Sequence, residues 1–227
     1  MKLFLSVVSL STLAYTCSAM AEAVHGDIWL YANGNQLVTG SYDHTNGEII
    51  SLNTRVFEAE FGIDPSFPLS GDEPGFGAAN SLTGIRFTMN LAQGLSMWNG
   101  SGYDASVNIL NFSYGSQSTS STTGGALSFL GAASTHVHPE YTLSNSIGDP
   151  ANGIYLAAFT YQSVGMISSD VFYAVFNLGM SEEDHAAATE WVEVNLVPTP
   201  AAFALLGLAG LASRRRRSRA AVQVFIL

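Results

Sequence analysis

Two histidines in the second half of the chain have the spacing of a metal-binding pair. His136 and His138 are separated by one residue, and Glu140 follows two positions later. In an extended chain, alternate side chains share a face and lie about 6–7 Å apart. Imidazole and carboxylate groups gathered on one face can hold Zn²⁺, Mn²⁺ or Fe²⁺. The spacing therefore predicts a metal site, with zinc as the first candidate and His136, His138 and Glu140 as ligands.

Other residues could complete this site in place of Glu140. The remaining histidines of the chain are His25, His44 and His185. The alternative interpretation is that His136 and His138 are polar residues on a solvated strand face, without any ion. Metal analysis of the purified protein would separate the two interpretations.

The sequence lacks the common motifs of catalysis. It has no Gly-x-Ser-x-Gly elbow, no His-Glu-x-x-His helix and no glycine-rich phosphate loop between a strand and a helix. We therefore expect a protein that is not an enzyme. A glycosidase stays open as an alternative, because the two carboxylates of its active site have no fixed sequence spacing.

The charge of the chain is concentrated and acidic between residues 22 and 197. All eighteen acidic residues lie there, whereas only Arg55 and Arg86 of the eight basic residues do. Such a field repels polyanions, so nucleic acid is excluded as a partner. The same field attracts divalent cations, although an acidic surface also simply favours solubility.

Short segments rich in Val, Ile, Phe, Tyr and Thr alternate with Gly, Asn, Asp, Ser and Pro, which is typical of antiparallel sheet. The pattern predicts an all-β domain, an antiparallel β-sandwich or jelly roll, with one short helix over 182–191 capped by Ser181. Asn33-Gly34-Asn35 and Thr45-Asn46-Gly47 are expected to close hairpins, so the first strands should form a meander. Two long loops are expected, over 62–82 and 115–125. The predicted strands are 27–31, 36–39, 48–53, 55–61, 85–90, 106–114, 136–143, 154–161, 171–177 and 192–196.

The first residues have the features of a secretory signal peptide. Lys2 precedes an apolar stretch, and Ala19-Met20-Ala21 supplies a small-x-small cleavage site. We expect a signal peptide over 1–21 and a β-sandwich domain over 22–196. Cleavage after Ala21 would remove Cys17, the only cysteine of the chain, so the exported body would hold no internal disulfide.

The C-terminal part combines three features in a fixed order. Val197-Pro198-Thr199-Pro200 is followed by an apolar run over 201–212 and then by basic residues. The run would span only about 18 Å as a helix, and the arginines favour the cytoplasmic side of a membrane. A buried C-terminal helix with a basic tail is the alternative. The basic residues that end the segment are Arg214, Arg215, Arg216 and Arg217.

This order resembles the PEP-CTERM sorting domain of exosortase substrates, with Pro198, Thr199 and Pro200 as the recognition signature. The middle residue of that signature is usually glutamate, where this chain has Thr199. The resemblance implies a sorting segment over 197–217, a tail over 218–227 and a membrane sorting enzyme, exosortase, as a partner. It also implies transient anchoring in the membrane, followed by a place at the cell surface or outside the cell, with extracellular polysaccharide as a further expected partner.

The body is similar to uncharacterised bacterial PEP-CTERM proteins in the stretches 26–30, 55–62, 72–76 and 136–138. Some of these resemble a set placed under zinc-dependent repression, which favours a zinc role. Two functions are therefore expected as alternatives. The first is an exported, non-catalytic surface or matrix protein that contacts sugars through aromatic residues such as Trp98, Tyr103 and Tyr114. The second is an extracytoplasmic zinc-binding protein centred on His136 and His138.

Overall fold

The computed structural model describes residues 26–197, and these form β-sheets with one α-helix. Most neighbouring strands are antiparallel; β1 pairs with β6, and β4 with β16, in parallel. The elements are β1 (Asp27–Asn33), β2 (Gln36–Asp43), β3 (Glu48–Leu52), β4 (Val56–Glu60), β5 (Ser70–Gly71), β6 (Phe76–Ala78), η1 (Asn80–Leu82), β7 (Arg86–Leu91), β8 (Ser96–Trp98), β9 (Tyr103–Ala105), β10 (Ile109–Tyr114), β11 (Gln117–Ser120), β12 (Gly125–Leu130), β13 (His136–Val137), β14 (Glu140–Ser144), β15 (Gly153–Ser163), β16 (Phe172–Leu178) and α1 (Glu182–Asn195).

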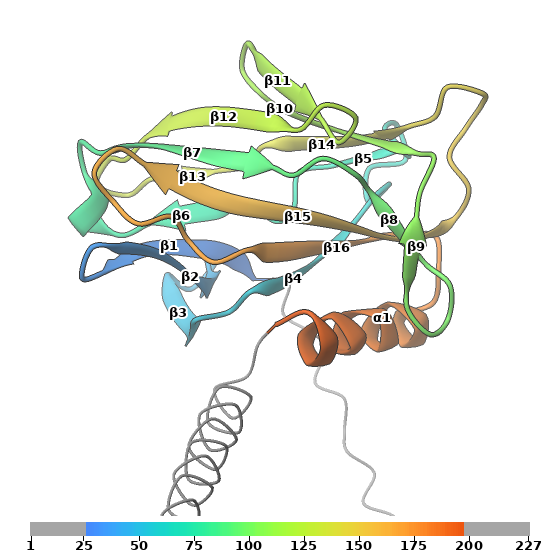
Figure 1. Cartoon of the computed structure of the whole chain (residues 1–227), viewed down its shortest axis with the longest axis horizontal. Helices are drawn as coiled ribbons and strands as arrows, with labels where there is room; N and C mark the ends of the chain where they lie inside the picture. Colours follow the sequence, from blue (N-terminus) through green and yellow to red (C-terminus); the bar gives the residue numbers. More distant parts are fainter. Residues whose placement is uncertain (1–25, 198–227) are drawn as a thin grey trace, which may run out of the picture.

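The strands form three sheets, and Figure 1 shows those of the largest sheet spread from β12 at the top to β4 lower down. One sheet has the order β13-β6-β1-β2-β3, and another has the order β11-β10-β14-β5. The largest sheet contains β12-β7-β15-β16-β4, with β8 pairing to β15 and β9 to β8. The antiparallel run β1-β2-β3 confirms the predicted meander, and Gly34 and Gly47, with φ of 60° and 72°, lie in its two turns.

One hydrophobic core connects the three sheets. Phe76 of β6 makes edge contacts with Phe87 of β7 and Phe129 of β12, with ring centroids 5.8 and 4.8 Å apart. On the same face of the largest sheet, Phe112 of β10 contacts Phe159 of β15, two residues from Tyr161, which Phe76 also contacts. Strands such as β7 alternate buried and less buried residues, because each turns only one face to this core. The largest sheet therefore packs against both of the others.

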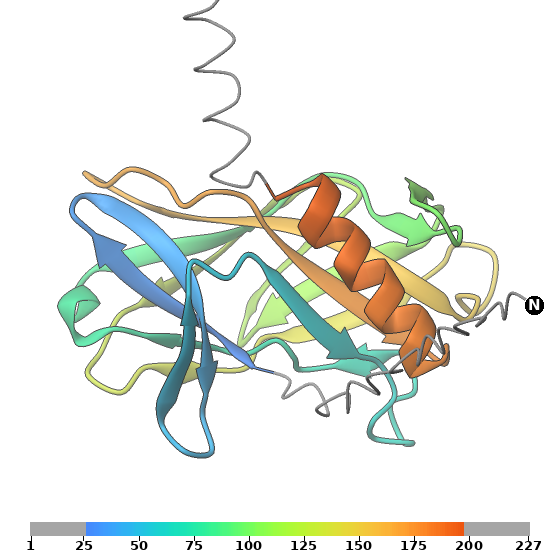
Figure 2. The same ribbon diagram turned by 90° about the horizontal axis from the view of Figure 1, so that it is seen from below.

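Helix α1 crosses one end of the largest sheet and packs on β16 and β4 (Figure 2). Ser181 caps it by accepting a hydrogen bond from the Asp184 backbone N–H, as the sequence predicts. The predicted strand over 192–196 is wrong, because the helix continues to Asn195. Val192 is buried one turn after Ala188 on the face that meets the sheet, so packing extends the helix.

Several predicted boundaries differ from the structure. The expected loop over 62–82 contains β5, β6 and η1, and the expected loop over 115–125 contains β11. The short strands β8, β9 and β12 were not predicted. The predicted strand 136–143 is broken at Pro139 into β13 and β14, which belong to different sheets. Proline has no backbone N–H to continue a sheet ladder, and the chain changes sheets there.

The predicted signal peptide and sorting segment, with Pro198, Thr199, Pro200 and the arginines, lie outside the described residues. Within residues 26–197, no helix combines the length and the apolar character that a membrane crossing would need.

Candidate metal centre

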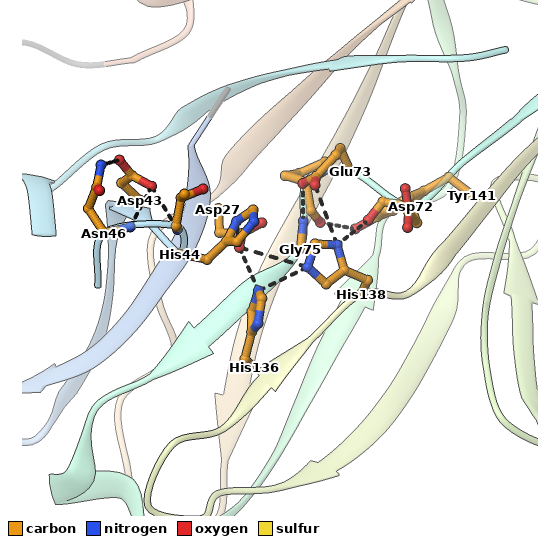
Figure 3. Close-up of polar contacts among 12 residues, drawn as sticks. Asp27, Asp43, His44, Asn46, Asp72, Glu73, Gly75, His136, His138 and Tyr141 are labelled. Atoms are coloured by element: carbon orange, nitrogen blue, oxygen red, sulfur yellow. Dashed lines mark hydrogen bonds and ion pairs between the residues drawn. The ribbon is translucent and has the colours of Figure 1, made fainter. Parts of the chain in front are cut away.

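Four side chains that can bind metal converge at one end of the sheet β13-β6-β1-β2-β3 (Figure 3). Asp27 is the first residue of β1, and His44 follows the last residue of β2. His136 opens β13, and His138 comes directly after that strand. The two predicted histidines therefore lie together, and the chain brings Asp27 and His44 to them from more than ninety positions away.

The sheet register explains why these residues meet. Val137 pairs with Phe76, and Phe76 pairs with Ile28 across β13, β6 and β1. Continuing this register by one residue places His138 and Asp27 on either side of Gly75. Because Gly75 carries no side chain, the two neighbouring side chains can lean toward each other above it.

The donor atoms all lie within 4.8 Å of one another, near the separations that a shared ion requires. The Asp27 Oδ2 atom lies 2.8 Å from His136 Nε2, 3.1 Å from His44 Nδ1 and 3.9 Å from His138 Nε2. The Nε2 atoms of His136 and His138 are 2.9 Å apart. In a tetrahedron with zinc–ligand distances of about 2.0–2.1 Å, donor atoms are separated by about 3.3 Å. Small adjustments would therefore place all four donors around one ion.

The buried carboxylate of Asp27 lies at the base of the cluster. Its side chain is 0% exposed, whereas those of His44, His136 and His138 are 43%, 37% and 26% exposed. Among residues 26–197, the Asp27 Oδ1 atom has no hydrogen-bond partner, and no lysine or arginine pairs with Asp27. A buried carboxylate without a compensating cation is unfavourable. A metal ion held by Oδ2 and the imidazoles would supply the missing positive charge.

The tautomer of His138 also suits metal binding. Its Nδ1 atom lies 3.1 Å from the backbone oxygen of Asp72, which can only accept a hydrogen bond. Nδ1 therefore carries the proton, and the lone pair of Nε2 points into the cluster. Metal-bound histidines commonly donate their second ring N–H to a carbonyl or carboxylate in this way.

Glu73 borders the cluster. Its Oε1 atom lies 3.4 Å from His138 Nδ1, and its Oε2 atom accepts a hydrogen bond from the Gly75 backbone N–H. Burial, followed by the nearby Asp27 carboxylate, raises the pKa of Glu73 to about 7, against the lowering influence of the Gly75 N–H and His138. The folded protein therefore holds this proton more tightly than the unfolded chain. As the pH rises from about 4.5 to about 7, the contribution of Glu73 to the free energy of unfolding therefore decreases.

The prediction that Glu140 is a ligand is wrong. Glu140 begins β14, in another sheet, and is exposed beside a pocket of about 310 Å³ lined also by Phe67 and Asp72. The two-residue period of the strand ends at Pro139, so Glu140 does not share the face of the histidines.

Of the other candidates, His44 joins the cluster and His25 lies outside the described residues. His185 is buried on α1, where its Nε2 atom bonds to the Val175 carbonyl oxygen at 3.0 Å and two glutamates lie nearby, Glu60 and Glu182. It therefore takes no part in the cluster around His136.

Adding a methyl group at Gly75 is expected to disturb the cluster directly. A Cβ atom there would lie 2.6 Å from Asp27 Oδ1 and 2.7 Å from His138 Cε1, closer than real Cβ contacts. Gly75→Ala should therefore weaken zinc binding at least about tenfold, the lower limit for displaced supporting groups, in isothermal titration calorimetry. Gly102→Ala is the matched control, because its Cβ would meet Trp191 at an ordinary 3.5 Å. Equal zinc affinity in the two variants would show that the space above Gly75 is not needed.

Comparison of the chain with models of protein families finds no match, and curated proteins and solved structures show no significant similarity to it. The function is therefore argued from the geometry of the cluster.

Proposed function

We propose that this protein binds one zinc ion through His44, His136, His138 and Asp27. The observation that carries the proposal is the convergence of three imidazole nitrogens on a buried carboxylate that has no lysine or arginine partner among residues 26–197. Three imidazole nitrogens and one carboxylate oxygen are enough to coordinate a tetrahedral zinc ion without any ligand from outside the protein.

The donor chemistry favours zinc among the available divalent cations. Ca²⁺ and Mg²⁺ are bound by six or more oxygen ligands, whereas imidazole suits Zn²⁺ and other transition metals. The cluster offers mostly nitrogen, in a number that matches tetrahedral zinc. Mn²⁺ and Fe²⁺, which the sequence leaves open, prefer more ligands and more oxygen. The proposal is therefore a zinc-binding protein, and it assigns no catalytic step to the ion.

Metal analysis of the purified full chain tests this proposal. We expect one zinc ion per chain by mass spectrometry under native conditions, and thermal unfolding that shifts upward when zinc is added. At a free zinc concentration a hundred times the Kd, binding stabilises the folded state by about 2.7 kcal/mol. Zinc uptake that is weak, equalled by Ca²⁺ and removed by moderate salt would instead indicate an acidic surface that attracts cations, and the proposal would fail.

The place of action follows from the sequence and remains a prediction. The signal peptide and the PEP-CTERM-like segment favour an exported protein that exosortase processes, so the zinc site would lie outside the cytoplasm. A surface or matrix role is compatible with zinc binding. Of the aromatic residues expected to contact sugars, Trp98 and Tyr103 pack against Trp191 and are only partly exposed, whereas Tyr114 is exposed.

We also propose that the three facing sheets constitute a β-sandwich of the jelly-roll type. The shared aromatic core between the sheets supports this assignment.

A further inference from the structure

Glu73 occupies an unusual place beside the candidate zinc site. It lies between β5 and β6, and its two carboxyl oxygens face different groups. Oε2 accepts a hydrogen bond of 2.9 Å from the Gly75 backbone N–H, which fixes the carboxyl group in one orientation. Oε1 is then left 3.4 Å from His138 Nδ1, the ring nitrogen opposite the Nε2 atom that faces His136 and Asp27 (Figure 3).

Both ring nitrogens of His138 have a defined role in this arrangement. Nδ1 donates to the Asp72 carbonyl oxygen and faces Glu73, whereas Nε2 faces His136 and Asp27. A carboxylate near the remote nitrogen of a metal-bound histidine fixes the ring orientation and makes the ligating nitrogen more basic. Glu73 is placed to act on the ion in this way without touching it.

The surroundings of Glu73 leave His138 as its basic neighbour. The Glu73 side chain is only 24% exposed. Within residues 26–197, no lysine or arginine is paired with Glu73. Among these residues its one ion-pair contact is with His138, at 3.4 Å between Oε1 and Nδ1.

We infer that Glu73 is a positioning residue of the zinc site, which holds His138 through Nδ1 so that Nε2 is directed at the ion. The inference rests on the proposed zinc binding. Glu73, His138 and the ion then form a carboxylate–histidine–metal series, and the Asp72 carbonyl supports the same ring nitrogen. Asp72 and Glu73 thereby orient the His138 ring through Nδ1, and Gly75, which has no side chain, leaves space for the ring.

Substitution of Glu73 tests the inference with two readouts, the zinc affinity and the melting temperature of the metal-free protein. Glu73→Gln keeps the size and an acceptor oxygen, so we expect zinc affinity to fall about tenfold, and Glu73→Ala about a hundredfold, the range found for lost outer-shell partners. Competition with a chelator of known affinity measures both. The metal-free Glu73→Gln protein should melt at the same temperature as the unsubstituted protein, because the amide keeps the size of the side chain and an oxygen that can accept the Gly75 hydrogen bond.

Cobalt supplies a signal that reports on the ligands themselves. The visible absorption of Co²⁺ bound in place of zinc should change in Glu73→Gln, because the His138 ring is less firmly held. Glu140→Gln is the matched control, since Glu140 is an exposed glutamate outside the cluster, and it should leave affinity and spectrum unchanged.

The outcomes separate this inference from the proposed function. If the unsubstituted chain binds zinc and Glu73→Gln binds it within twofold with the same cobalt spectrum, Glu73 has no positioning role, and the zinc site stands without it. A lower metal-free melting temperature combined with unchanged affinity would make Glu73 a structural residue and would also overturn the inference. If the unsubstituted chain takes up no stoichiometric zinc, both proposals fail together.

Discussion

Zinc binding is expected to disappear when His136 and His138 are both replaced by alanine. The double variant would keep only Asp27 and His44 of the four donors, and two protein ligands hold zinc poorly. Each single substitution should weaken zinc affinity by more than about a hundredfold, the upper limit for partners that do not touch the metal. Calorimetric titration with Zn²⁺ measures the loss. Metal-free variants that lack His136 should also lose at least about 1–3 kcal/mol of stability, because the buried Asp27 carboxylate loses a hydrogen-bond partner.

The alternative explanation for zinc uptake is that the acidic surface of the protein attracts cations without a defined site. If diffuse negative charge held the ions, removing two imidazoles would change little, and Glu140→Gln would weaken uptake as much as either histidine substitution. Equal zinc uptake by the unsubstituted chain and the double histidine variant would therefore disprove the site.

Phe76→Ala is expected to destabilise the whole fold by about 3–5 kcal/mol, the usual cost of removing a buried phenylalanine ring. The Phe76 ring is fully buried and makes edge contacts with Phe87, Phe129 and Tyr161, so truncation would leave a cavity where two sheets meet. Chemical denaturation of the metal-free protein measures this loss. Zinc affinity should fall as well, because β6 lies between the strands that carry His136 and Asp27.

Phe67→Ala provides the comparison for this substitution. Phe67 has the same side chain, but it is 62% exposed, so its loss should change stability by less than about 0.5 kcal/mol. Similar effects at the two positions would contradict the assignment of Phe76 to the core.

The parts of the fold that local patterns encode could be predicted. Alternating burial in strands such as β4 and β7 leaves a two-residue period in the sequence, and Gly34 and Gly47 mark the turns of the meander. The errors arose where tertiary packing overrides local preference. Residues 192–196 are rich in valine and look like a strand, yet Val192 extends α1 because it fits beside Ala188 on the sheet.

Half of the candidate site could be predicted for a related reason. His136 and His138 are neighbours in sequence, so their proximity follows from the period of a strand. Asp27 and Glu73 reach them only through the pairing of β1, β6 and β13, which no short motif encodes. The predicted ligand Glu140 failed because the strand period was continued past Pro139, where the chain leaves the sheet.

The distance along the chain between Asp27 and His136 gives the ion a second effect, on the unfolded state. These ligands are 109 positions apart, and an ion that stays bound to both would close a loop of that length. In the chain-entropy description, a covalent cross-link over about 100 residues removes roughly 4–5 kcal/mol of conformational freedom from the unfolded chain. The only cysteine of this protein is Cys17, so no pair of cysteines within the chain can make such a link. A zinc ion would cross-link the first strand to the middle of the chain. Unlike a disulfide, this link would resist reducing agents and would be removed by chelators.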